Sequence, residues 1–145
     1  MIETGRLILR DWRDADAGPF LAMGNDAEVM RYLGPQQSRV DVEAAIARQR
    51  GFLRTLGYCF WALERREDGA FLGFCGLKPG PDGTPIAGEV EIGWRLRRDA
   101  CGQGYAREAA EAALGWGWAN TDAPMIAAIT VPANRRSWGL MERLV

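Results

Sequence analysis

The feature that most constrains the fold is a strand pattern that runs through a glycine-rich loop into an alanine-rich helical pattern. Glu89–Leu96 alternates polar and apolar side chains, as a strand with one apolar face does. After Gly102 and Gly104, small and apolar residues recur at helical spacing from Ala106 to Leu114. The free amides and partial positive charge of such a helix start would attract a phosphate, which the glycines let the backbone approach closely. This segment therefore predicts an anion site.

The other segments predict a single α/β (α+β) domain over residues 1–145, with a mixed, mostly antiparallel sheet flanked by helices. The expected elements are a strand at 7–10, a helix capped by Asp14 or Asp16, a short helix over 26–32, an amphipathic helix from Asp41 to Gly57, a hairpin of Tyr58–Glu64 and Phe71–Leu77, a buried strand over Met125–Val131, and a last helix opened by Asn134 or Ser137.

Composition removes several functional classes. The chain has no histidine, which excludes Ser/His/Asp hydrolysis, Cys/His catalysis and histidine-ligated metals. Its net charge of −1 and scattered arginines do not favour nucleic acid as a partner. Three widely spaced cysteines do not favour disulfides or zinc, and no apolar run is long enough to span a membrane. We expect a soluble cytoplasmic protein that binds no metal.

Three interpretations of the glycine loop follow from its residues alone. A P-loop requires Lys and Ser or Thr after its second glycine, but Tyr105 and Ala106 follow Gly104. A dinucleotide fold requires a third glycine where Arg107 stands, and a βαβ unit where a hairpin is predicted. A tight glycine turn with no ligand remains open.

A resemblance covers nearly the whole chain. The segments that carry it are GEVEIGWRLRRDACGQGYAREAAEAAL, ITVPANRRSWGLMERL, TGRLILRDWRDAD and DAEVMRYLG. They resemble the GNAT superfamily of acyl-CoA-dependent N-acetyltransferases, specifically its RimJ/RimL-like branch, which acetylates protein N-termini and small amines. The resemblance implies an enzyme, an acyltransferase, that uses acetyl-CoA as cosubstrate and a peptide N-terminus or small-molecule amine as acceptor.

The resemblance also implies where the cosubstrate binds. In the family, amides of a Gln/Arg-x-x-Gly-x-Gly/Ala loop hold the pyrophosphate of coenzyme A; here Cys101 stands at the first position, which puts the tightness of binding in doubt. A splayed strand offers amides to the pantetheine and the acetyl carbonyl, and an asparagine contacts the pantetheine arm. Carried over to this sequence, the cofactor-binding residues are Trp94, Arg95, Leu96, Gly102, Gln103, Gly104, Tyr105, Ala106 and Asn134.

Two residues are candidates for catalysis. Glu91 lies on the polar face of the predicted strand and could accept the amine's proton, directly or through water, although Glu89 shares that face and either carboxylate could simply face solvent. Ser137 matches a family serine near the thioester sulfur. Other branches place a tyrosine acid at the position of Met141, so Ser137 is the remaining proton donor, unless it only caps the helix.

The family continues past the last helix with a hairpin that completes the sheet, and the sequence ends at Val145. Three explanations are open: truncation, strands supplied by a partner chain, or loss of part of the acceptor site. An open sheet edge favours association, so a homodimer is one expectation. A non-catalytic acyl-CoA sensor is the alternative function, and the acceptor amine is not encoded in any motif.

Overall fold

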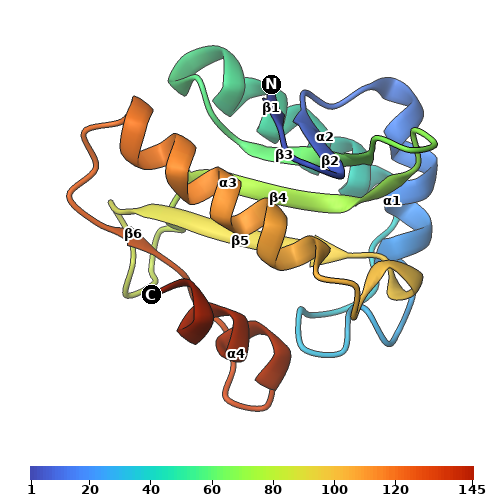
Figure 1. The fold of residues 1–145 in the computed structure, drawn as a ribbon. Coiled ribbons are helices and arrows are strands. Elements are labelled where there is room, and N and C mark those ends of the chain that lie inside the picture. The colour runs from blue at the N-terminus through green and yellow to red at the C-terminus, as the bar shows by residue number, and fades with distance from the viewer.

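The computed structural model describes residues 1–145 and contains six strands, four α-helices and two short 3-10 helices (Figure 1). In chain order these are β1 (Ile2–Glu3), β2 (Leu7–Arg10), η1 (Asp14–Asp16), α1 (Ala17–Gly24), α2 (Arg39–Leu56), β3 (Phe60–Arg65), β4 (Phe71–Pro79), β5 (Val90–Leu96), η2 (Arg98–Ala100), α3 (Tyr105–Asn120), β6 (Ile126–Ala127) and α4 (Arg135–Leu144). None of the helices combines the length and the apolar character needed to cross a membrane.

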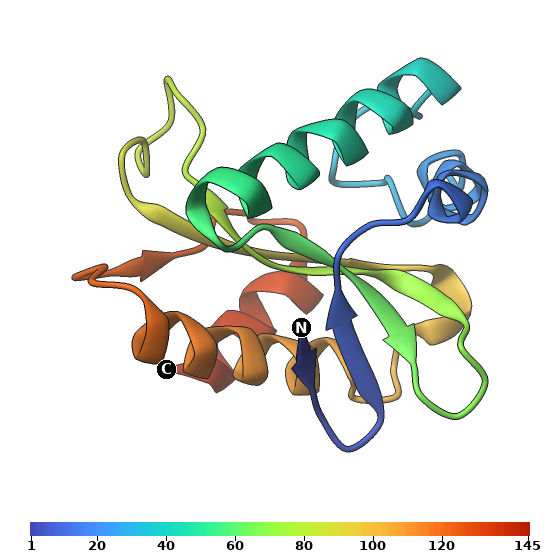
Figure 2. The same cartoon turned by 90° about the horizontal axis from the view of Figure 1, so that it is seen from above.

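The strands form one sheet in the order β1-β2-β3-β4-β5-β6. All neighbours are antiparallel except β5 and β6, which run parallel because α3 returns the chain to the same end of the sheet. Helices α1 and α2 lie on one face, and α3 and α4 lie on the other (Figure 2). The predicted mixed, mostly antiparallel sheet flanked by helices is thus confirmed.

Each face of the sheet has its own apolar core. On the α3 face, leucines of the strands pack against three fully buried alanines of the helix, Ala109, Ala110 and Ala113. Their small side chains let α3 lie close to the sheet. On the α1 and α2 face the core is aromatic, and the rings of Phe60 and Phe74 stack with centroids 5.2 Å apart. These two rings lie directly beneath β5.

Local signals account for the helix ends. Ser38 caps α2 by accepting a hydrogen bond from the amide of Asp41, whose carboxylate accepts one from the amide of Ser38 in return. Gly57 ends α2 in the left-handed conformation, as expected. Asp16, one of the two predicted caps, occupies the N-cap position of α1, but its side chain accepts no hydrogen bond from this helix because its carboxylate binds Arg10 and the amide of Arg13.

Two sequence expectations fail in the segments that flank the sheet. Residues 26–32 form consecutive turns and not a helix, and the Asp26 side chain accepts the amide of Glu28 in competition with helical bonding. The predicted buried strand Met125–Val131 is wrong over most of its length, because only β6 (Ile126–Ala127) is a strand. Only Ile126 and Ala127 pair with β5, and Ile129 and Val131 are 44% and 45% exposed. Beyond Ala127 the segment no longer pairs with β5, so the rest of it adds nothing to the sheet.

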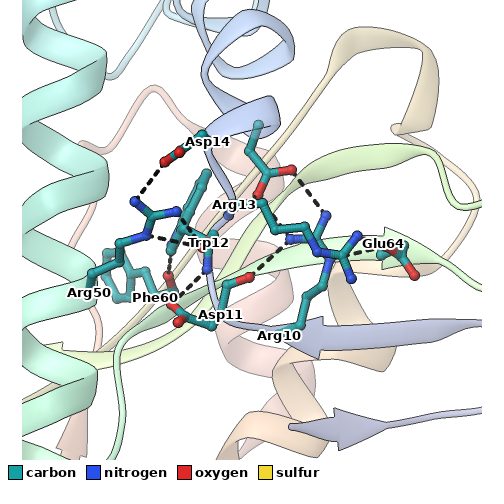
Figure 3. A network of polar contacts seen from close by, with 9 residues as sticks. Arg10, Asp11, Trp12, Arg13, Asp14, Arg50, Phe60 and Glu64 are labelled. Carbon is teal, nitrogen blue, oxygen red and sulfur yellow. Dashed lines mark hydrogen bonds and ion pairs between the residues drawn. The ribbon is translucent and has the colours of Figure 1, made fainter.

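A network of polar contacts around Arg10 and Glu64 ties the segment before α1 to the sheet (Figure 3). The Arg10 guanidinium donates to both carboxylate oxygens of Asp16, at 2.9 and 3.0 Å, and to Glu64 at 3.0 Å. The Arg10 and Asp16 side chains are only 8% and 6% exposed. Burial opposes the charge on Asp16, but the hydrogen bonds from Arg10 and the Arg13 amide hold its pKa below the ordinary value.

Replacing Asp16 by asparagine should lower the free energy of unfolding at pH 7 by about 3 kcal/mol, because Arg10 is left with a buried, partly uncompensated charge. A depressed native pKa stabilises the fold above the unfolded value of about 4, and this contribution is lost as pH falls through the native pKa. Urea titrations should therefore show the difference from wild type shrinking below about pH 4.

The matched control is Asp14→Asn. Asp14 also pairs with an arginine, Arg50, at 3.0 Å, but its side chain is 97% exposed. A pair of this kind stabilises a protein by less than about 1 kcal/mol. Equal losses in the two variants would contradict the role given to the buried pair.

Candidate active site

The edge of β5 that faces β6 is open over most of its length. The ladder between the two strands ends at Glu91 and Ala127, whereas β5 continues to Leu96. The amide of Gly80 donates to the Glu89 carbonyl and that of Arg97 donates to the Leu72 carbonyl, so the odd-numbered residues of β5 bond to β4. The amides of Trp94 and Leu96 therefore point toward the open edge, where no strand lies opposite.

A cleft of about 360 Å³ opens at this edge, between β5, the segment after β6 and α4. Most of its walls are apolar, and its polar groups come from a few side chains and the β5 backbone. Its lining residues are Tyr32, Leu33, Phe60, Phe74, Glu91, Ile92, Gly93, Trp94, Arg95, Ile129, Thr130, Val131, Ser137 and Met141. The structure thus brings both predicted catalytic residues, Glu91 and Ser137, into one cavity with two of the predicted β5 residues.

Glu91 is held in this cleft by an ion pair. Its Oε2 atom lies 2.8 Å from Nζ of Lys78, and the two side chains are only 12% and 18% exposed. The residues stand directly opposite each other in the β4–β5 register. Lys78 also lies 5.3 Å from the centre of the Phe60 ring. Glu89, the alternative carboxylate, precedes β5 and does not line the cleft.

Ser137 reaches the cleft from the first turn of α4. The Oδ1 atom of Asn134 accepts a hydrogen bond from the Ser137 amide at 3.4 Å and caps this helix. The cap is therefore Asn134, which leaves the Ser137 hydroxyl free of that task. Met141, one turn further along, lines the same cleft with a thioether that has no proton to donate.

The glycine loop leads into an uncapped helix start. Gly102 and Gly104 adopt φ of 76° and 83°, a conformation that favours glycine, and Gly104 occupies the N-cap position of α3. No side chain caps this helix, so the amides of its first turn, from Tyr105 to Arg107, are available to an external acceptor. A Cβ on Gly102 would meet no atom within 4 Å. We call the glycine loop and these first-turn amides the mouth of α3. An anion can reach it.

The N-terminal hairpin braces this mouth. Arg6 donates to the Gln103 carbonyl at 2.9 Å and lies 4.3 Å from the centre of the Tyr105 ring. Glu108 is bound by the Thr4 hydroxyl and by Nε of Arg6 at 2.8 Å. Partial burial opposes its charge, but these hydrogen bonds hold the pKa of Glu108 below its ordinary value. Its carboxylate is therefore engaged away from the free amides.

The buried cysteines offer no nucleophile. Burial raises the pKa of Cys59 to about 12 and also raises that of Cys75, so both remain thiols near neutral pH. Among the residues that line the cleft, the groups that can move protons are the carboxylate of Glu91 and the hydroxyls of Ser137, Tyr32 and Thr130.

Sequence reasoning missed several residues of the site. The predicted strand ends at Leu77 and so leaves out Lys78, the only lysine in the chain, whereas β4 extends to Pro79. Extending the strand by two residues would have set it opposite Glu91. Arg6, Tyr32 and Phe60 carried no comparable signal, because their contacts join segments far apart in the sequence.

Known proteins share this architecture. The sequence model of the acetyltransferase (GNAT) domain matches residues 6–144. YkkB of Bacillus subtilis is 32% identical over 97% of this chain and 81% of its own length. An acetyltransferase from Agrobacterium tumefaciens superposes with a TM-score of 0.87 at 25% identity, over 99% of this chain and 81% of that one. Spermidine N-acetyltransferase from Vibrio cholerae, solved with CoA and spermine, superposes with 0.75 at 17% identity, over 97% and 80%.

Proposed function

Because the chain belongs to the GNAT acetyltransferase family, we propose that it transfers an acetyl group from acetyl-CoA to a primary amine, which is a protein N-terminus or a small molecule, as in the RimJ/RimL-like branch. The observation that carries the proposal is the continuity of the site. An uncapped helix mouth, an open strand edge and a cleft with a carboxylate follow one another along a single segment, residues 91–106.

The residues present fit coenzyme A. The first-turn amides of α3 and the positive end of its dipole suit a diphosphate, and the space beside Gly102 is open. The outward amides of Trp94 and Leu96 suit the amide groups of a pantetheine arm. Asn134 stands at the start of α4 beside the cleft, with its side-chain oxygen already used as a cap.

Acetyl-CoA supplies an activated thioester, and the protein supplies orientation and proton transfer. Glu91 accepts the proton of the incoming amine, directly or through a water, so that the nitrogen lone pair is free. Lys78 compensates the charge of Glu91 in the half-buried cleft. The open amides of β5 stabilise negative charge that develops on the acetyl oxygen. Ser137 donates a proton toward the departing sulfur.

Replacing Ser137 by alanine should lower kcat by less than about tenfold, because a thiol with a pKa near 8.5 leaves readily without help. Thiol release measured at saturating substrate tests this. Glu142→Gln is the control for damage to α4, since Glu142 is an exposed residue of the same helix that does not line the cleft. An unaltered kcat in Ser137→Ala, or a loss of more than about a hundredfold, would be inconsistent with an assisting acid.

Two measurements test the proposed function as a whole. Titration calorimetry should detect binding of coenzyme A, and thiol release should rise when acetyl-CoA is mixed with at least one amine from a panel of peptides and small amines. Binding without release on any amine would favour an acyl-CoA sensor. No binding at all would end the proposal.

A further inference from the structure

One cationic side chain in the cleft has no counter-ion. Arg95 forms no ion pair, and its only hydrogen-bond partner is the neutral side-chain amide of Gln37, at 3.1 Å. Its Nε atom is buried and has no partner of any kind. Burying a charged group without a partner raises the free energy of the folded state. An unpaired guanidinium in a cavity therefore requires an explanation.

The surroundings of Arg95 hold it toward the cavity. Its guanidinium lies 5.2 Å from the centre of the Phe74 ring, and both residues line the cleft. Desolvation lowers the pKa of Arg95 to about 10, which still leaves it charged near neutral pH. Glu91, the other charged residue that lines the cleft, is already paired with Lys78, so the positive charge of Arg95 is left uncompensated.

Arg95 lies on the same face of β5 as Glu91 and opposite the face that packs on α3. Side chains alternate along a strand, so residues 91, 93 and 95 point toward the Phe60 and Phe74 rings. The α3 mouth that suits the diphosphate belongs to the other face of the sheet. Arg95 therefore adjoins the space left for the acceptor.

Resting on the proposed function, we infer that the acceptor amine carries a carboxylate and that the Arg95 guanidinium binds it while the amine lies at Glu91. The Cα atoms of residues 91 and 95 are roughly 13 Å apart, from the rise of a strand. The geometry suits a peptide with an acidic residue near its N-terminus or a longer ω-amino acid, and it disfavours a polyamine, which would meet the uncompensated positive charge.

The test uses matched acceptor pairs that differ only in a carboxylate or a carboxamide. One arm compares peptides with aspartate or asparagine as the second or third residue; the other compares ω-amino acids of increasing length with their amides. The readouts are kcat/KM from thiol release and, without turnover, calorimetric binding of each acceptor to the protein saturated with coenzyme A. Wild type should favour the carboxylate by about tenfold or more in the preferred arm, the scale of a charged hydrogen bond.

Three variants assign that preference to Arg95. Arg95→Gln should bring the ratio within each pair toward one, and Arg95→Lys should keep part of it because the charge remains. Arg31→Gln should keep the ratio, since Arg31 is an exposed cation beside Tyr32 at the rim. Circular dichroism verifies that each variant folds.

The outcomes separate this inference from the proposed function. Turnover with equal use of both members of each pair, or a preference for cationic amines, would overturn the role of Arg95 and leave the acetyltransferase standing. A preference that survives in Arg95→Gln, or that disappears in Arg31→Gln, would do the same. A protein that does not bind coenzyme A would overturn both.

Discussion

Replacing Glu91 by glutamine is expected to lower kcat/KM by about a thousandfold, the middle of the range for a lost general base. Glutamine keeps the size and polarity of the side chain but cannot accept the amine's proton. The pH–rate profile should change shape as well, because the variant has no side-chain carboxylate at this position to take part in proton transfer. Thiol release followed across pH with one acceptor measures both effects.

Glu89→Gln is the matched control for this experiment. Glu89 is a neighbouring carboxylate that does not line the cleft, so its loss should leave the profile and the rate close to those of wild type. The Glu91 role would be abandoned if Glu91→Gln kept the wild-type profile. A large loss in Glu89→Gln alone would transfer the role to Glu89, which the cleft geometry does not favour.

Replacing Gly104 by aspartate should weaken coenzyme A binding by about a thousandfold, because two or more charge-assisted hydrogen bonds at the α3 mouth are blocked and a negative charge is placed there. Gly104 has φ of 83°, and its Cβ would meet a guanidinium nitrogen of Arg6 at 3.3 Å. Calorimetric dissociation constants for coenzyme A measure the effect.

Two controls separate charge at the mouth from backbone strain. Gly104→Asn adds the same bulk without charge, and asparagine tolerates positive φ about as well as aspartate. It should bind coenzyme A more tightly than Gly104→Asp. Gly69→Asp places the same side chain at φ of 73° in the β3–β4 turn, with no atom within 4 Å of its Cβ, and should bind like wild type. If Gly69→Asp bound as poorly as Gly104→Asp, general destabilisation would explain the loss.

The parts of the site that sequence reasoning predicted correctly depend on local geometry. The alternation along Glu89–Leu96 puts Glu91 and Arg95 on one face, as the structure shows, because successive side chains of a strand point to opposite sides. The glycine loop and the start of α3 could also be predicted from the sequence, because glycines in a turn and helical spacing are local signals.

The parts that were missed depend on contacts between distant segments. The predicted strand Met125–Val131 is apolar enough to be buried, but pairing with β5 stops after Ala127 and nothing in its composition reveals that. Arg6 reaches Gln103 across 97 positions, and no spacing rule connects the two. The segment 26–32 satisfied a helical pattern, yet a local side-chain hydrogen bond at Asp26 competes with the helix.

The contacts of Thr4 with Glu108 and of Arg6 with Gln103 connect the amino end of the chain to the proposed coenzyme A site. Proteolytic trimming of the first few residues would release Glu108 beside the free amides, where its charge would compete with a bound anion. A fusion tag for purification or immobilisation at this end would weaken the same contacts of Thr4 and Arg6. Attachment sites at the opposite end of α3, near the exposed Asn120, would avoid these contacts.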